Sequence, residues 1–139
     1  MLGARFLFGY RFNRPFGPML VDLNPSVVCN LRCPMCWTSL QGKEREVWGG
    51  LRQKELSFDE IYDLLCDLKS LGTKFIGVAG QGESLLRKDI MDILYAIRGL
   101  EMQGLLTTNG TLLDEKVSRE LVKLDWTKVT FSLDGPSAE

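Results

Sequence analysis

The chain has 139 residues, of which 45% are hydrophobic and 25% charged, and its net charge is −1. This balance is typical of one globular domain and excludes a largely disordered chain, while the low net charge gives no sign of nucleic-acid binding. The absence of histidine among the 139 residues excludes Ser-His-Asp and Cys-His catalytic groups and His-based metal sites.

The N-terminal residues 1–18 are aromatic and basic. Phe6, Phe8, Tyr10 and Phe12 alternate with other residues in the period of two that is typical of a strand. We predict an N-terminal extension that packs on a main domain of residues 19–139. Docking of this extension to a partner or a membrane surface is the alternative. The chain contains no transmembrane-length apolar run, which would need roughly 18 residues.

Strands and helices alternate along the main domain. The first helix is expected to begin at Ser57, because Ser57 and Glu60 have the spacing of a capping box, and to end at Gly72. Helical spacing of apolar residues predicts a second helix over residues 88–102 and a third that follows Asp114. The predicted strands cover residues 19–28, 74–79, 104–108 and 127–134, and a long loop covers residues 37–56.

The β-α-β-α-β-α-β order predicts an α/β fold with a parallel sheet of right-handed βαβ units. In the fourth strand, Val129, Phe131 and Leu133 alternate with polar residues, which predicts one face toward helices and one toward a polar lumen. We therefore expect a partial (βα) barrel with helices on its outer face. A doubly wound sheet is the alternative, because residues 74–79 are apolar throughout. Four strands amount to about half of an eight-unit barrel, so we expect that the chain is truncated or is completed by another chain.

The strongest chemical motif lies directly after the first predicted strand. Cys29, Cys33 and Cys36 have the spacing C-x3-C-x2-C. Three thiolates can ligate three irons of a [4Fe–4S] cluster and leave the fourth iron open for chemistry. A closed site would need a further ligand, either Cys66 for a cluster or an unknown group for zinc. Cys66 lies beside Leu65 on a predicted helix, which favours core packing. This tight cysteine group also favours a reducing, cytoplasmic location.

Three further motifs follow the next three strands: Gly-Gln-Gly-Glu-Ser at residues 80–84, Thr-Thr-Asn-Gly-Thr at residues 107–111 and Ser-Leu-Asp-Gly-Pro at residues 132–136. Together with the cysteine motif, they resemble the radical S-adenosylmethionine (radical SAM) superfamily. Residues 80–84 resemble the Gly-Gly-Glu-Pro motif of that family, with Ser84 in place of proline. Residues 132–136 resemble members that carry an additional iron–sulfur domain of the SPASM or twitch type.

The resemblance implies about four βα units of a six-unit open barrel, with a [4Fe–4S] cluster on Cys29, Cys33 and Cys36 and with SAM bound beside it. Met35 stands where the family usually has an aromatic residue that packs on adenine, and a thioether can also pack on a flat ring. The other residues expected around SAM are Gly80, Gln81, Gly82 and Glu83 at its methionine amino group, Thr108 and Asn109 along the pocket, and Ser132 and Asp134 at the ribose.

The implied activity is reductive cleavage of SAM to a 5′-deoxyadenosyl radical, which abstracts hydrogen from a substrate. Residues 132–136 favour a maturase-like oxidoreductase that acts on a peptide or protein. The implied partner is a reductant protein such as a flavodoxin or ferredoxin. Two alternatives remain: an iron–sulfur electron carrier or binding module without SAM chemistry, and an inactive fragment that needs a missing C-terminal half.

Overall fold

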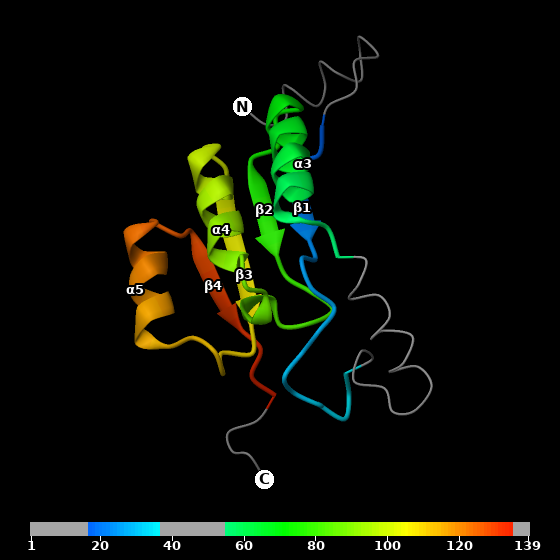
Figure 1. Ribbon diagram of the computed structural model, residues 1–139, viewed down its shortest axis with the longest axis vertical. Coiled ribbons are helices and arrows are strands. Elements are labelled where there is room, and N and C mark those ends of the chain that lie inside the picture. The colour runs from blue at the N-terminus through cyan, green and yellow to red at the C-terminus, as the bar shows by residue number, and fades with distance from the viewer. Residues whose placement is uncertain (1–16, 37–54, 135–139) are drawn as a thin grey trace.

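The computed structural model describes residues 17–36 and 55–134, and these contain one four-stranded parallel sheet with the strand order β1-β2-β3-β4. Three α-helices cover one face of this sheet (Figure 1). Because neighbouring strands are consecutive in sequence, the chain forms successive βα units. Among the described residues no pairing joins β4 to β1, so the sheet is open. The predicted partial barrel is confirmed. The strands are β1 (Leu20–Leu23), β2 (Phe75–Val78), β3 (Gln103–Thr108) and β4 (Lys128–Phe131), and the helices are α3 (Phe58–Ser70), the 3-10 helix η3 (Ser84–Leu86), α4 (Ile90–Gly99) and α5 (Glu115–Lys123).

The hydrophobic core lies between the sheet and its helices. Ile76 and Val78 of β2 and Leu106 of β3 are almost fully buried. They belong to one cluster with the buried faces of α3 and α4, while α5 adds Leu121 at its edge. Burial of this many large aliphatic side chains on one side is what fixes the helices to that face.

The opposite face of the sheet is more polar. Register pairs Asp22 of β1 with Gly77 of β2, and a β-carbon at Gly77 would lie 2.1 Å from Oδ1 of Asp22. The exposed Asp22 carboxylate therefore lies beside Gly77, where the β-carbon of any other residue would collide with it. Lys128 and Thr130 of β4 are also exposed. Within residues 17–36 and 55–134 no helix covers this face, so the arrangement does not fit a doubly wound sheet with helices on both faces.

Local signals in the sequence fix the helix ends. The capping box at α3 is present, since the Ser57 N–H donates to Oε2 of Glu60 at 2.8 Å and the Glu60 N–H donates to Oγ of Ser57 at 3.3 Å. The chain leaves this helix at Gly72, whose φ of 89° is in the left-handed region that glycine adopts without strain. Asp114 caps α5 by accepting from the Val117 N–H at 2.8 Å.

Several predicted boundaries were wrong. β1 ends at Leu23 rather than at residue 28, because the backbone beyond Pro25 bonds to the loop after β2 instead of continuing the ladder. The second helix begins at Ile90, after the unpredicted turn η3, and ends at Gly99. β4 ends at Phe131, which is 48% exposed. The predicted apolar face of this strand is thus reduced to Val129, which packs against the core.

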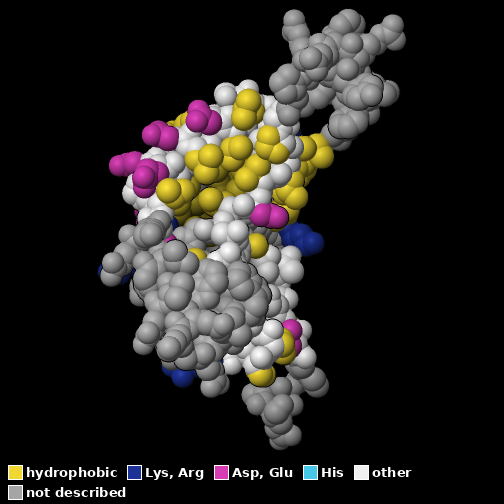
Figure 2. Space-filling model, turned by 90° about the vertical axis from the view of Figure 1, so that its right-hand side faces the viewer, with side chains coloured by type: hydrophobic (Ala, Val, Ile, Leu, Met, Phe, Trp, Pro, Cys, Tyr) yellow, Lys and Arg dark blue, Asp and Glu magenta, His cyan; other side chains and the backbone are white. Residues whose placement is uncertain are grey.

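Strand β1 forms one edge of the sheet, and the side of the molecule with β1 and α3 carries a broad apolar area (Figure 2). Exposed apolar side chains of this part of the chain include Leu20, Leu64 and Leu71. The predicted extension of residues 1–18 lies outside the described residues except for its last two, so its packing stays a prediction. Within the described ranges, no helix has the length and apolar character needed to cross a membrane.

Candidate functional site

All four strands point the same way, so their C-terminal ends meet at one edge of the sheet (Figure 1). The four sequence motifs follow these ends: the cysteine loop after β1, residues 80–84 after β2, residues 109–111 after β3 and residues 132–134 after β4. In α/β barrels, this edge is where functional residues gather. The fold therefore places all the predicted motifs on one side of the molecule.

The cysteine loop contains one tight turn. The Cys36 N–H donates to the Cys33 carbonyl oxygen at 3.0 Å, which closes a turn through Pro34 and Met35. Cys29 is exposed, and Cys33 and Cys36 are half-buried. Within residues 17–36 and 55–134, no three Cys, Asp or Glu side chains are gathered in an arrangement that holds a metal ion. The donor chemistry, three soft thiols on one short loop, nevertheless fits an iron–sulfur cluster.

Backbone hydrogen bonds join the loop after β2 to residues 26–28, which lead into the cysteine loop. The Gly82 N–H donates to the Ser26 carbonyl oxygen at 3.1 Å, and the Glu83 N–H donates to the Val28 carbonyl oxygen at 2.7 Å. A β-carbon at Gly82 would lie only 2.3 Å from that Val28 oxygen. Glycine at position 82 is therefore what allows the two backbones to approach so closely.

Glu83 is a buried hub that joins the loop after β2 to the end of β3. It is only 3% exposed, and three donors reach its carboxylate. The Leu85 N–H and the Thr108 hydroxyl donate to Oε1 at 3.1 and 2.8 Å, and the Asn109 N–H donates to Oε2 at 2.8 Å. Glu83 thus ties the β2 loop to the end of β3. Its expected contact with the SAM amino group stays a prediction.

A ring of polar side chains connects the β3 loop to the cysteine loop. Nδ2 of Asn109 donates to Oδ1 of Asn30 at 2.9 Å and to Sγ of Cys29 at 3.8 Å. Nδ2 of Asn30 donates to the Thr111 hydroxyl at 2.8 Å, and that hydroxyl donates to Oδ1 of Asn109 at 2.7 Å. The structure therefore brings Asn109, one of the predicted site residues, into contact with the first cysteine.

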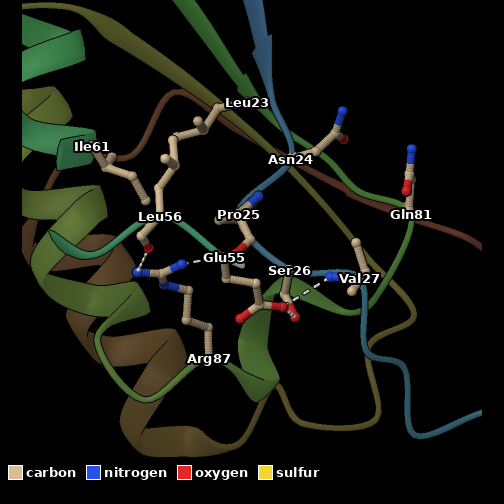
Figure 3. Close-up of a pocket in the computed structure, with 10 residues that line it drawn as sticks. All are labelled: Leu23, Asn24, Pro25, Ser26, Val27, Glu55, Leu56, Ile61, Gln81 and Arg87. Atoms are coloured by element: carbon tan, nitrogen blue, oxygen red, sulfur yellow. Dashed lines mark hydrogen bonds between the residues drawn. The ribbon is translucent and has the colours of Figure 1, made fainter. Parts of the chain in front are cut away.

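A cavity of about 230 Å³ lies beside residues 23–27, the segment between β1 and the cysteine loop (Figure 3). Glu55 accepts from the Ser26 hydroxyl at 2.9 Å and from the Val27 N–H at 3.1 Å on one side. On the same side, the Arg87 guanidinium donates to the Pro25 and Leu56 carbonyl oxygens at 2.9 and 2.7 Å. These contacts hold the segment after β1 in place from the helix side of the sheet.

Arg87 also forms an ion pair with Asp89. Its Nε lies 2.6 Å from Oδ1 of Asp89, and the Arg87 side chain is only 8% exposed. The hydrogen bond from this guanidinium holds the pKa of the Asp89 carboxyl below its ordinary value. No sequence pattern predicted this ion pair, because an Arg and an Asp two residues apart usually form a solvated surface pair.

The other predicted site residues are placed as follows. Gly80 is exposed after β2, Gln81 lines the cavity, and Ser132 and Asp134 are exposed after β4. Thr108 is buried and uses its hydroxyl on Glu83. Met35 is 66% exposed at the tip of the cysteine turn.

Four residues were not predicted: Asn30, Glu55, Arg87 and Thr111. Only Asn30 and Thr111 carried a signal, because both stand inside or directly beside the motifs.

The model of the radical SAM superfamily matches residues 23–139 of the chain. This chain belongs to the radical SAM superfamily. That superfamily uses a [4Fe–4S] cluster and SAM, and its members are enzymes. The sequence-based identification is therefore confirmed at the level of family, fold and cofactors.

Curated relatives with quite different names match this radical SAM chain. It is 34% identical over 125 residues to the Fe-coproporphyrin III synthase of Methanosarcina barkeri, covering 90% of the chain and 29% of the synthase. It is 36% identical over 126 residues to the probable GTP 3′,8-cyclase of Archaeoglobus fulgidus, covering 89% of the chain and 39% of the cyclase. The chain thus spans well under half the length of these relatives.

Two solved structures share the fold. BtrN in an open conformation superposes with a TM-score of 0.69 at 21% identity, covering 88% of this chain and 52% of BtrN. Streptococcus suis SuiB bound to S-adenosylmethionine superposes with a TM-score of 0.66 at 22% identity, covering 88% of this chain and 27% of SuiB. At this level of identity, the likeness supports the arrangement of strands and helices and nothing finer.

Proposed function

We propose that Cys29, Cys33 and Cys36 hold a [4Fe–4S] cluster and that the neighbouring strand-end loops bind SAM beside it. The observation that carries this proposal is the position of the three thiols. They stand on one eight-residue loop at the C-terminal edge of a radical SAM fold, and backbone hydrogen bonds join the residues just before this loop, Ser26 and Val28, to the Gly-Gln-Gly-Glu loop. When bound, the cluster and SAM supply reductive cleavage of SAM to a radical that abstracts hydrogen from a substrate.

The chain's own residues would bind and orient these groups. Gly80 is exposed after β2, so that its backbone can approach the methionine part of SAM. The exposed thioether of Met35 is available to pack on the adenine ring. Ser132 and Asp134 offer a hydroxyl and a carboxylate at the end of β4 for the ribose hydroxyls.

The substrate would meet the polar face of the sheet, where Asp22 and Thr130 are exposed. We propose a peptide or protein substrate, in a maturase-like reaction, on the basis of residues 132–136. The fold of SuiB, which has been solved bound to the precursor peptide SuiA, is compatible with this choice. A nucleotide or a porphyrin is the second candidate, because the curated relatives are named as a GTP cyclase and a coproporphyrin synthase.

Two further parts of the proposal concern the cell. Reductive chemistry at a cluster needs an electron donor, and a flavodoxin or ferredoxin is the class of protein that supplies single electrons at low potential. Cysteine thiols that ligate iron must stay reduced, so we place the protein in a reducing compartment, the cytoplasm.

The test is anaerobic reconstitution of the protein with iron and sulfide, followed by EPR spectroscopy of the reduced protein with and without SAM. We expect about four irons per chain and a spectrum that changes when SAM is added. Cys29→Ala should lose the cluster. Cys66→Ala is the matched control and should keep it, because Cys66 lies on α3 rather than in the strand-end loops. A cluster indifferent to SAM would favour an electron carrier, and failure of the wild type to bind iron would refute the proposal.

A further inference from the structure

Asn109 has contacts that a residue merely lining a SAM pocket would not need. Its side-chain amide lies 3.8 Å from Sγ of Cys29, within the range for a hydrogen bond to sulfur. The two residues are 80 positions apart in sequence, on the loops after β1 and β3. The contact is therefore created by the fold and not by local chain geometry.

The orientation of this amide is determined by its neighbours. Oδ1 of Asn109 accepts from the Thr111 N–H at 3.0 Å and from the Thr111 hydroxyl at 2.7 Å. Because both of these groups donate, the oxygen must face Thr111 and the NH2 group must face the cysteine loop. The acceptor Oδ1 of Asn30, at 2.9 Å, holds the NH2 group from the other side.

The backbone of Asn109 is anchored as firmly as its side chain. Its N–H donates to Oε2 of the buried Glu83 at 2.8 Å. Asn109 as a whole residue is half-buried. A donor fixed in this way keeps its direction without a reorganisation cost, and its effect on a charged sulfur is larger than that of a mobile surface group.

From this geometry we infer that Asn109 is a positioning residue that raises the reduction potential of the cluster by donating a hydrogen bond to the Cys29 sulfur. This inference rests on the proposed role of Cys29 as an iron ligand. Hydrogen bonds to the sulfurs are among the factors that set the potential of an iron–sulfur cluster. A donor favours the more electron-rich, reduced state, so its loss should make the cluster harder to reduce. The Leu31 N–H, at 3.4 Å from the same sulfur, is a second donor that side-chain substitutions leave in place.

The test is an EPR-monitored redox titration of the reconstituted protein and two variants. Asn109→Asp keeps an oxygen that faces Thr111 but replaces the donor with a negative carboxylate, and Asn109→Ala removes the side chain altogether. We expect both variants to bind iron as the wild type does. At a fixed potential, the ratio of reduced to oxidised cluster should fall by roughly tenfold in Asn109→Asp, which corresponds to about 59 mV for a one-electron couple, and by less in Asn109→Ala.

Gln103→Ala provides a matched control, because it removes an exposed amide from the opposite end of the same strand. Its potential should equal that of the wild type. The inference is overturned if Asn109→Ala binds four irons and titrates at the wild-type potential, because a shift in Asn109→Asp alone would come from the added negative charge. It is equally overturned if Asn109→Asp cannot bind the cluster, because Asn109 would then act in loop assembly rather than in tuning. If the wild type itself binds no cluster, the proposed function fails and not this step alone.

Discussion

Gly82→Ala tests whether close backbone packing positions the cysteine loop. The added β-carbon would lie 2.3 Å from the Val28 carbonyl oxygen and 2.5 Å from the Val28 nitrogen. Ordinary contact begins at 3.4 Å, and the crowded atoms belong to the backbone and cannot rotate away. The two segments must separate by about 1 Å, which breaks the 2.7 Å bond from the Glu83 N–H to the Val28 oxygen.

Overpacking and the lost hydrogen bond together set the expected decrease in the free energy of unfolding. Overpacking costs about 1–3 kcal/mol, and a lost backbone hydrogen bond costs about 1 kcal/mol. We expect Gly82→Ala to lower the free energy of unfolding by about 2–4 kcal/mol and to reduce the iron bound after reconstitution. Urea denaturation followed by far-UV circular dichroism measures the first quantity, and an iron assay measures the second.

Gly99→Ala is the control for this substitution. It has the same chemistry, but Gly99 ends α4 and a β-carbon there meets nothing within 4 Å. It should stabilise the protein by about 0.5–1 kcal/mol, because alanine loses less entropy in a helix. If the denaturation midpoint of Gly82→Ala matched that of the wild type, the two backbones would not be as close as described and the reasoning would fail.

Three further substitutions test the surroundings of the site. Glu83→Ala leaves the buried Thr108 hydroxyl and its neighbouring donors without an acceptor, so the free energy of unfolding should fall by about 1–3 kcal/mol in urea titrations; an unchanged value would contradict the hub role. Ser84→Ala should be neutral or slightly stabilising in the same assay, because the Ser84 hydroxyl is one of two buried polar side-chain groups without a partner among the described residues. The hydrogen bond from Arg87 lowers the pKa of the Asp89 carboxyl below its ordinary value, so this pair stabilises the fold above the unfolded-state pKa, and its contribution is lost as pH falls through the lower, folded-state pKa. Asp89→Asn should therefore flatten the acid side of the stability profile, and a profile identical to the wild type would show that the pair does not contribute.

The sequence by itself determined the family, the order of elements and the position of the motifs at the strand ends. These features depend on short-range information: a capping box at Ser57, apolar residues at helical spacing, and three cysteines whose spacing lies within one loop. Parallel strands with helical crossovers then require that the loops after successive strands meet at one edge. The structure has this arrangement, and no knowledge of contacts between distant residues was needed to predict it.

Only the tertiary structure decided which side chains meet at that edge. Glu83 is buried against Thr108 and Asn109 and so connects two loops, a role that its motif alone did not indicate. The contact of Asn109 with Cys29 and the hold of Arg87 on the segment after β1 also join residues that are far apart in sequence. Such contacts depend on register and packing between separate elements, and neither periodicity nor motif spacing carries that information.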